Sequence, residues 1–306
     1  MYQLIKNHKN YSLHFMVVIL GLTGVFGKLI SLESLNLVWY RMLIAFLSLF
    51  IFLLIKKEAF SISKKDFFGL LGVGSLVTLH WIFFFGSIKE TETVSIAVVC
   101  LSTSSLFSAL IEPLFFKRKI LIYELVMGLV VIIALVYILG TDSEYILGYI
   151  YGVLAAFFGT MFTLFNAKYI NKVSASKITM VEMLSGVIII GTIFIFNNNY
   201  TVNTVGQEDV PIWNEIFTNS ISFSDFNYLL ILGVLCTSMV FVWMTEIMKY
   251  ISPYSLIMAI NMEPIYSIIL ALIIFGDSEY MSTSFYIGSL VIVITVFLES
   301  YFKNKQ

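Results

Sequence analysis

Charged residues are scarce in this sequence of 306 residues, where Asp, Glu, Lys and Arg together make up 12%. Soluble domains carry about 25% charged residues, whereas here 59% of residues are hydrophobic and the mean hydropathy is +0.94. This composition excludes an ordinary soluble enzyme, and the high hydrophobicity excludes an intrinsically disordered chain. The formal net charge of −1 provides no basic surface for DNA or RNA, so we expect no nucleic-acid partner.

Residue types that hold metals or carry out catalysis are also few. The two cysteines, Cys100 and Cys236, lie in apolar segments and are too few for a disulfide framework or a cysteine-based zinc site. The sequence contains no H-E-x-x-H motif, no G-x-S-x-G nucleophile motif and no G-x-x-x-x-G-K-[ST] nucleotide-binding loop. We therefore expect no enzymatic activity, no catalytic residue, no metal site and no cofactor.

Long apolar segments are what the sequence has in abundance. A membrane-spanning helix needs about 20 predominantly apolar residues, because the hydrocarbon core of a bilayer is about 30 Å thick. Segments of this kind occur at 12–32, 36–55, 66–88, 93–116, 121–140, 146–170, 176–196, 226–249, 253–275 and 282–302. They predict an all-α integral membrane protein with ten transmembrane helices.

The basic residues indicate how these helices are oriented. If the N-terminus lies in the cytoplasm, fifteen of the 18 Lys and Arg residues fall in cytoplasmic segments, as the positive-inside rule requires. We therefore expect a multi-pass protein of the cell (inner) membrane with both termini cytoplasmic. The longest loop, at about 197–225, lies on the opposite side and contains no Lys or Arg.

The chain divides into two halves of five predicted helices each, residues 1–140 and 141–306. Because five is an odd number, the second half begins on the opposite side of the membrane, which makes the halves an inverted repeat. The second helix of each half carries one ionisable residue in its first third, Arg41 or Glu182. Transporters use this symmetry and bind their substrate near the membrane midplane, between the halves.

Residues 252–277 resemble the ninth helix of the EamA family, which belongs to the drug/metabolite transporter superfamily. This segment begins Ser252-Pro253-Tyr254-Ser255-Leu256, continues with Glu263-Pro264 and ends in Phe275-Gly276-Asp277. Val38-Trp39-Tyr40-Arg41 resembles the arginine-bearing second helix of that family. The resemblance covers nearly the whole chain and implies a ten-helix protein that exports amino acids, other metabolites or drugs.

Two positions depart from the family pattern. Leu20-Gly21 stands in the first helix, where the family usually has Trp-Gly. Ser102-Thr103-Ser104 stands in the fourth helix, where a Glu-Pro pair would align with that of the ninth. The resemblance therefore implies transport without identifying the cargo.

Charged residues deep in the predicted helices are the first candidates for a site, because a charge at the bilayer centre costs about 2.5–3.5 kcal/mol on insertion scales. Glu263 is the deepest, and Pro264 beside it frees backbone carbonyls, so the carboxylate would bind a substrate amine or a coupling proton. Arg41 would bind a substrate carboxylate through two parallel hydrogen bonds. The alternatives are a packing pair between Glu263 and Arg41 or Lys28, and an Arg41 that extends to the lipid headgroups.

Five further residues complete the predicted substrate or coupling site. Lys28 ends a row of glycines in the first helix, and His80 lies mid-helix beside Trp81, where it would carry a proton or hydrogen-bond a ligand. Ser104 belongs to a cluster of hydroxyls in the fourth helix, and Asn261 lies two residues before the deep carboxylate. Structural alternatives are headgroup contact for Lys28, an interhelical hydrogen bond for His80 and close helix packing for Ser104. Four acids nearer the cytoplasm are expected to pair with neighbouring Lys or Arg residues: Glu112, Glu124, Glu182 and Glu246.

These features predict a secondary transporter, and more specifically an exporter, of a small polar metabolite such as an amino acid or amine. It would work by alternating access, with membrane lipids around it and with a proton as the candidate coupling ion. Helices five and ten, which have few polar residues, would support the bundle or form a homodimer. The alternative is a flippase for a lipid or lipid-linked molecule, which would need a wide lateral opening toward the bilayer.

Overall fold

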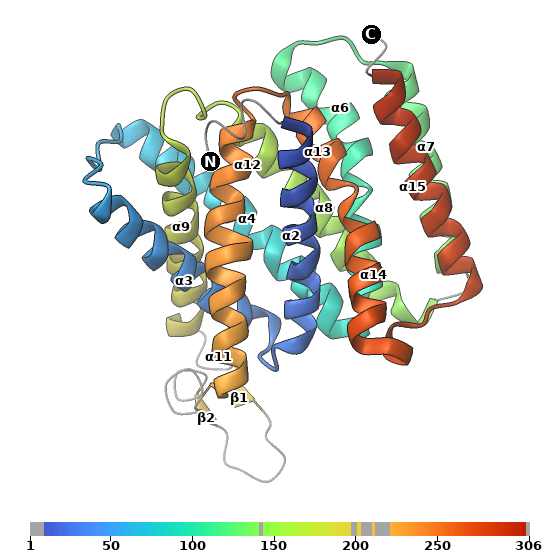
Figure 1. Ribbon diagram of the computed structural model, residues 1–306, viewed down its shortest axis with the longest axis horizontal. Coiled ribbons are helices and arrows are strands. Elements are labelled where there is room, and N and C mark those ends of the chain that lie inside the picture. Colours follow the sequence, from blue (N-terminus) through green and yellow to red (C-terminus); the bar gives the residue numbers. More distant parts are fainter. Residues whose placement is uncertain (1–8, 141–142, 197–200, 203–209, 212–220, 304–306) are drawn as a thin grey trace.

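The computed structural model describes residues 9–140, 143–196, 201–202, 210–211 and 221–303, which form a bundle of helices (Figure 1). Nine helical segments in this part of the chain are long and apolar enough to cross a membrane, and the last helix provides a tenth crossing. The predicted all-α membrane fold is thereby confirmed. The first helix begins and the last helix ends at the top of Figure 1, which we call the upper end of the bundle; the opposite end is the lower end.

The first repeat contains five crossings, and the fourth of them consists of two helices. In chain order its elements are α2 (Lys9–Leu29), α3 (Ser34–Ile55), α4 (Lys64–Thr91), α5 (Val94–Leu101) with α6 (Ser104–Phe116), and α7 (Ile122–Leu139).

The second repeat has the same order, with short 3-10 turns at two of its helix ends and a π-helical segment inside its third crossing. Its elements are η1 (Ser143–Tyr145) with α8 (Ile146–Asn166), α9 (Ala175–Phe196), α11 (Phe223–Leu230) with η2 (Ile231–Met239) and α12 (Val240–Ile247), α13 (Pro253–Ile260) with α14 (Glu263–Phe275) and η3 (Gly276–Glu279), and α15 (Thr283–Lys303).

The fourth and ninth crossings are interrupted at corresponding positions. The first helix of each pair, α5 or α13, has 8 residues, and the second, α6 or α14, has 13. Two-residue turns, Ser102–Thr103 and Asn261–Met262, separate the members of each pair. Broken helices at corresponding positions of two repeats commonly surround the substrate site of a transporter. The two turns are therefore the first place to look for a site.

Helices of opposite repeats are interleaved in the bundle. α4 packs against α8 and α9, and α2 packs against α14. α7 and α15 pack against each other at one edge of the molecule (Figure 1). Exposed apolar side chains cover this edge, among them Ile133, Val136, Leu290 and Ile294. Such a surface suits contact with lipid tails.

The expected loop at about 197–225 contains a two-stranded hairpin. β1 (Thr201–Val202) pairs antiparallel with β2 (Val210–Pro211). The remaining positions up to 220, namely 197–200, 203–209 and 212–220, lie outside the described residues.

The eighth crossing begins earlier than the apolar pattern predicts and has an unusual interior. It starts at Phe223 rather than 226, because the Ser222 hydroxyl caps it by accepting a hydrogen bond from the backbone N–H of Asp225 at 3.0 Å. Within its π-helical segment η2, the Thr237 hydroxyl donates to the carbonyl oxygen of Leu232 at 2.7 Å. Single π-helical turns inside α-helices are frequent at functional sites.

Gly74 allows α4 and α9 to cross closely. A Cβ atom on Gly74 would lie 2.7 Å from Cα of Glu182 and 2.6 Å from the carbonyl oxygen of the same residue. We expect Gly74→Ala to destabilise the protein by about 1–3 kcal/mol, as is typical of overpacking. Thermal unfolding in detergent would measure this, with Gly72→Ala as the control, because nothing lies within 4 Å of a Cβ atom there. Equal melting temperatures for the two variants would contradict the packing argument.

Candidate functional site

A small cavity of about 70 Å³ lies between the two repeats. Both interrupted crossings border it, with Leu101 and Ser104 on one and Ile260 and Glu263 on the other. One water needs about 10–15 Å³ measured in this way, so the cavity has room for a few waters or for part of a small ligand. Its lining is mostly apolar, and the side chains that bring polar atoms are Thr23, Arg41, His80, Trp81, Ser104, Thr160, Thr163 and Glu263.

Arg41 on α3 is fully buried in the cavity wall, so it does not extend to the lipid headgroups. Its Nε donates a hydrogen bond to the Thr237 hydroxyl at 2.6 Å, and its Nη2 lies 3.5 Å from the carbonyl oxygen of Cys236. The Trp81 ring covers the guanidinium, with 3.9 Å between the ring centroid and Cζ. These three contacts fix the position and the plane of the guanidinium.

The π-helical segment η2 supplies two of these contacts. A π-helical turn bonds each residue to the carbonyl five positions earlier, which displaces carbonyls from the regular α-helical ladder. The Cys236 carbonyl and the Thr237 hydroxyl therefore both face Arg41. The third guanidinium nitrogen, Nη1, is buried and has no hydrogen-bond partner among the described residues. A buried donor without a partner favours the binding of an acceptor such as a carboxylate.

Glu263 is the first residue of α14 and follows directly after the break in the ninth crossing. It is buried, with 5% of its surface exposed, and it lines the same cavity as Arg41. Neither of its expected packing partners, Arg41 and Lys28, forms an ion pair with it among the described residues; Lys28 pairs with Glu279 instead. The cavity is thus lined by one basic and one acidic side chain that form no direct ion pair with each other.

His80 on α4 also lines the cavity and is held in one orientation. Its Nδ1 lies 2.7 Å from the carbonyl oxygen of Ala155, and since a carbonyl only accepts, Nδ1 carries the proton in this contact. The ring lies between Phe84 and Phe162, with centroid distances of 6.2 and 5.6 Å. In the neutral form of the ring, this contact leaves Nε2 as the acceptor nitrogen.

Ser104 and Asn261 connect the two interrupted crossings. The Ser104 hydroxyl donates a hydrogen bond to Oδ1 of Asn261 at 2.8 Å, although the two residues lie 157 positions apart. Both residues are at the breaks, where the backbone leaves the helical ladder. Asn261 is not part of the cavity lining and reaches the site only through this bond.

The structure therefore brings together most of the predicted site residues. Glu263, Arg41, His80, Trp81 and Ser104 line one cavity. Lys28 lies elsewhere, at the lower end of the bundle, where its Nζ is 2.8 Å from Oε1 of Glu279.

Three of the acids nearer the upper end have the basic partners expected from the sequence. Arg118 lies 3.0 Å from Glu112 and 2.8 Å from Glu124, and Lys249 lies 2.7 Å from Glu246. Burial alone would lower the pKa of Arg118, but the hydrogen bonds and charges of Glu124 and Glu112 raise it above the ordinary value. These acids have structural partners and lie away from the cavity.

Glu182 on α9 does not follow this expectation. Its neighbour in sequence, Lys177, pairs with Glu58 at 3.1 Å instead. Glu182 is fully buried, and within the described residues both of its carboxylate oxygens lack a hydrogen bond of good geometry. The amide of Asn166 lies close enough to interact with it.

Four threonines contribute to the site without having been predicted, and one of them, Thr23 on α2, lines the cavity. Thr160 and Thr163 on α8 line the cavity and face it together because they are three residues apart, a spacing visible in the sequence. Thr237 holds Arg41, but its role depends on the π-helical turn, for which the sequence gives no recognisable signal.

Comparison with known proteins agrees with this architecture. The model of the EamA-like transporter family matches the chain twice, at residues 12–140 and 146–301. The chain therefore belongs to the EamA-like transporter family. A solved structure, titled only as the crystal structure of a protein, has the same fold, with a TM-score of 0.64 and 14% sequence identity over 93% of this chain and 94% of the other. No curated protein matches the sequence.

The hydrogen bond between the two breaks can be tested by a double-mutant cycle. We expect Ser104→Ala and Asn261→Ala each to destabilise the protein, and the double variant to cost less than the sum, with a coupling of about 0.5–1.5 kcal/mol. Unfolding in detergent would measure the four proteins of the cycle. Additive effects would mean that the bond does not join the two crossings in the folded protein.

Proposed function

We propose that the protein is a secondary transporter that exports a small polar metabolite, an amino acid or an amine, by alternating access. The observation that carries this proposal is that a basic and an acidic side chain, Arg41 and Glu263, line one cavity between the repeats. Buried charges are stable only with partners. A zwitterionic substrate supplies both partners, its carboxylate to Arg41 and its ammonium group to Glu263.

The rest of the cavity supports the same substrate class. Its apolar wall, which includes Phe84, Phe162 and Phe241, would receive the apolar part of such a molecule. The hydroxyls of Thr160 and Ser104 would add hydrogen bonds to its polar atoms. A simple amine would use Glu263 alone, and Glu263 would hold a coupling proton when the substrate is absent.

We also propose the orientation and surroundings of the transporter. The upper end, where the first helix begins and the last one ends, would face the cytoplasm of a cell membrane, as the distribution of basic residues favours. Export is the direction that resemblance to an exporting family suggests. The apolar edge formed by α7 and α15 would face lipid or a second copy of the chain.

Glu263→Gln tests the anionic half of the site. In proteoliposomes, with a panel of radiolabelled amino acids and amines and with or without a pH gradient, we expect this variant to lose coupled transport while its melting temperature stays close to that of the parent protein. Glu246→Gln is the matched control, because that acid pairs with Lys249 outside the cavity. Normal uptake by Glu263→Gln would contradict a role for Glu263. Transport of amphiphiles or lipids by the parent protein, without transport of the panel, would instead favour a flippase.

Arg41→Ala tests the cationic half in the same assay. Because the guanidinium would bind the substrate carboxylate, we expect the KM to rise by about tenfold or more for zwitterionic or acidic cargo and to change little for a purely cationic amine. An equal loss for both kinds of cargo would indicate that Arg41 has a structural role, through Trp81 and Thr237.

A further inference from the structure

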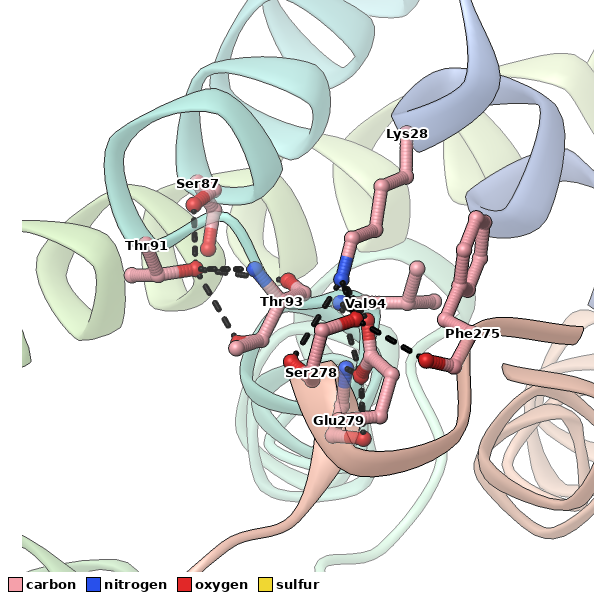
Figure 2. A network of polar contacts seen from close by, with 9 residues as sticks. Lys28, Ser87, Thr91, Thr93, Val94, Phe275, Ser278 and Glu279 are labelled. Atoms are coloured by element: carbon pink, nitrogen blue, oxygen red, sulfur yellow. Dashed lines mark hydrogen bonds and ion pairs between the residues drawn. The ribbon is translucent and has the colours of Figure 1, made fainter. Parts of the chain in front are cut away.

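A second polar network lies at the lower end of the bundle, and it centres on Glu279 (Figure 2). The carboxylate of this residue is fully buried at the end of the ninth crossing. Lys28, at the end of α2, approaches it to 2.8 Å and also donates to the Ser278 hydroxyl at 3.1 Å. The contact joins the first repeat to the second across 251 positions of sequence.

The same carboxylate caps the first helix of the interrupted fourth crossing. The backbone N–H of Val94 donates to Oε1 and Oε2 of Glu279 at 3.0 and 3.2 Å, and Ser95 donates from its backbone at 3.3 Å and from its hydroxyl at 2.9 Å. The first N–H groups of a helix lack intrahelical acceptors and carry partial positive charge, so they attract a carboxylate. Thr93, which occupies the capping position of α5, makes no such cap with its own side chain.

This cap connects the lower end of the bundle with the wall of the cavity. From Val94, α5 runs for 8 residues, about 12 Å, to Leu101 at the cavity. From the other direction, α14 leads from Glu263 in the cavity to the turn that carries Glu279. Three elements that line the cavity, namely α2, α5 and α14, thus meet at one buried carboxylate.

A second contact of the same kind closes this end. Asp225 on α11 accepts hydrogen bonds from the backbone N–H of Ser31 at 2.9 Å and from its hydroxyl at 2.6 Å. In both contacts, a carboxylate of the second repeat holds backbone groups of the first. At the upper end, the Arg118 and Lys249 ion pairs are each formed within one repeat, and the repeats are joined there by Glu58, which contacts Lys177 at 3.1 Å and the Ser174 hydroxyl at 2.7 Å.

Beside this closure lies a polar hollow at the same end. It is lined by Lys28, Glu33, Ile88, Lys89 and Glu92. Lys28 therefore belongs both to the hollow and to the ion pair with the buried carboxylate.

We propose that Glu279 is the gating residue of the lower end. Its carboxylate keeps α5 bound to the end of α14 and to Lys28, and the cavity opens to the lower side only when this carboxylate releases the N-terminus of α5. The inference rests on the proposed transport function, because a gate has a role only in a protein that moves a solute.

Access to a single cysteine in the cavity tests this gate without any substrate. Cys100 and Cys236 are replaced by Ala, and Thr23→Cys places one thiol in the cavity wall. A membrane-impermeant thiol reagent is added to intact cells, where it reaches the outer side, and to inverted vesicles, where it reaches the cytoplasmic side. We expect Glu279→Gln to raise the labelling rate at the lower, outer side by about tenfold or more and to leave the other side unchanged.

Glu33→Gln is the matched control, because this acid lines the hollow at the same end but does not contact α5 within the described residues. We expect it to label at the rate of the parent. If the Glu279→Gln variant does not fold, Val94→Pro takes its place. This substitution removes the backbone N–H of residue 94, which donates to both carboxylate oxygens, and leaves Glu279 itself unchanged. Proline is tolerated at the first position of a helix, and Thr93 already has the extended conformation that proline requires before it.

The outcomes separate the gate from both a structural role and a failure of the proposed function. Unchanged outer labelling in Glu279→Gln, or in Val94→Pro where that variant is used, would overturn the gate. An equal rise from both sides would also overturn it, because general loosening of the bundle affects both ends. The labelling rate could rise on the outer side alone while the parent protein transports no amino acid or amine of the panel. That result would retain the gate and reject the proposed cargo.

Discussion

The structure depends on the requirement that a chain in lipid satisfies its backbone polar groups internally. Two of its crossings interrupt the α-helical ladder, each at a two-residue turn between an 8-residue and a 13-residue helix. The backbone N–H groups of both turns still find internal partners, at carbonyls three or four residues earlier. Ser104 beside one turn also bonds Asn261 at the other, and Leu101, Ser104, Ile260 and Glu263, which flank the turns, line the cavity.

Carboxylates of the second repeat have two different environments. Glu263 faces the cavity without an ion-pair partner among the described residues, so it is available to a ligand. Glu279 and Asp225 are saturated with donors from the first repeat, backbone N–H groups among them. The first arrangement leaves a binding group open, whereas the second holds two elements together. The difference follows from what surrounds each group, since all three are acids at or near the end of a helix.

Much of this arrangement can be predicted from the sequence, and the exceptions have identifiable causes. Apolar length predicts the ten crossings, and depth in those crossings predicts Glu263 and Arg41, because few charges are tolerated there. The Thr237 contact could not be predicted, since it depends on a local π-helical turn. Glu279 could not be predicted either: an acid in a Gly276-Asp277-Ser278 turn reads as an exposed loop residue, and its partners lie 185 positions earlier. Glu182 shows the same limit, because Lys177, its expected partner, pairs with Glu58 instead.

The two repeats cap their corresponding half-helices in different ways, one with a residue of its own repeat and the other with a residue of the opposite repeat. α13 begins with Pro253, which has no N–H to satisfy, and Ser252 caps it locally by accepting a bond from Ser255. Movement of α13 away from the other repeat would therefore leave its cap intact. α5 begins with Val94 and depends on Glu279 of the other repeat for its cap. Its separation exposes both a buried carboxylate and free helix donors, so the lower end opens only with a compensating partner or at a substantial cost in free energy.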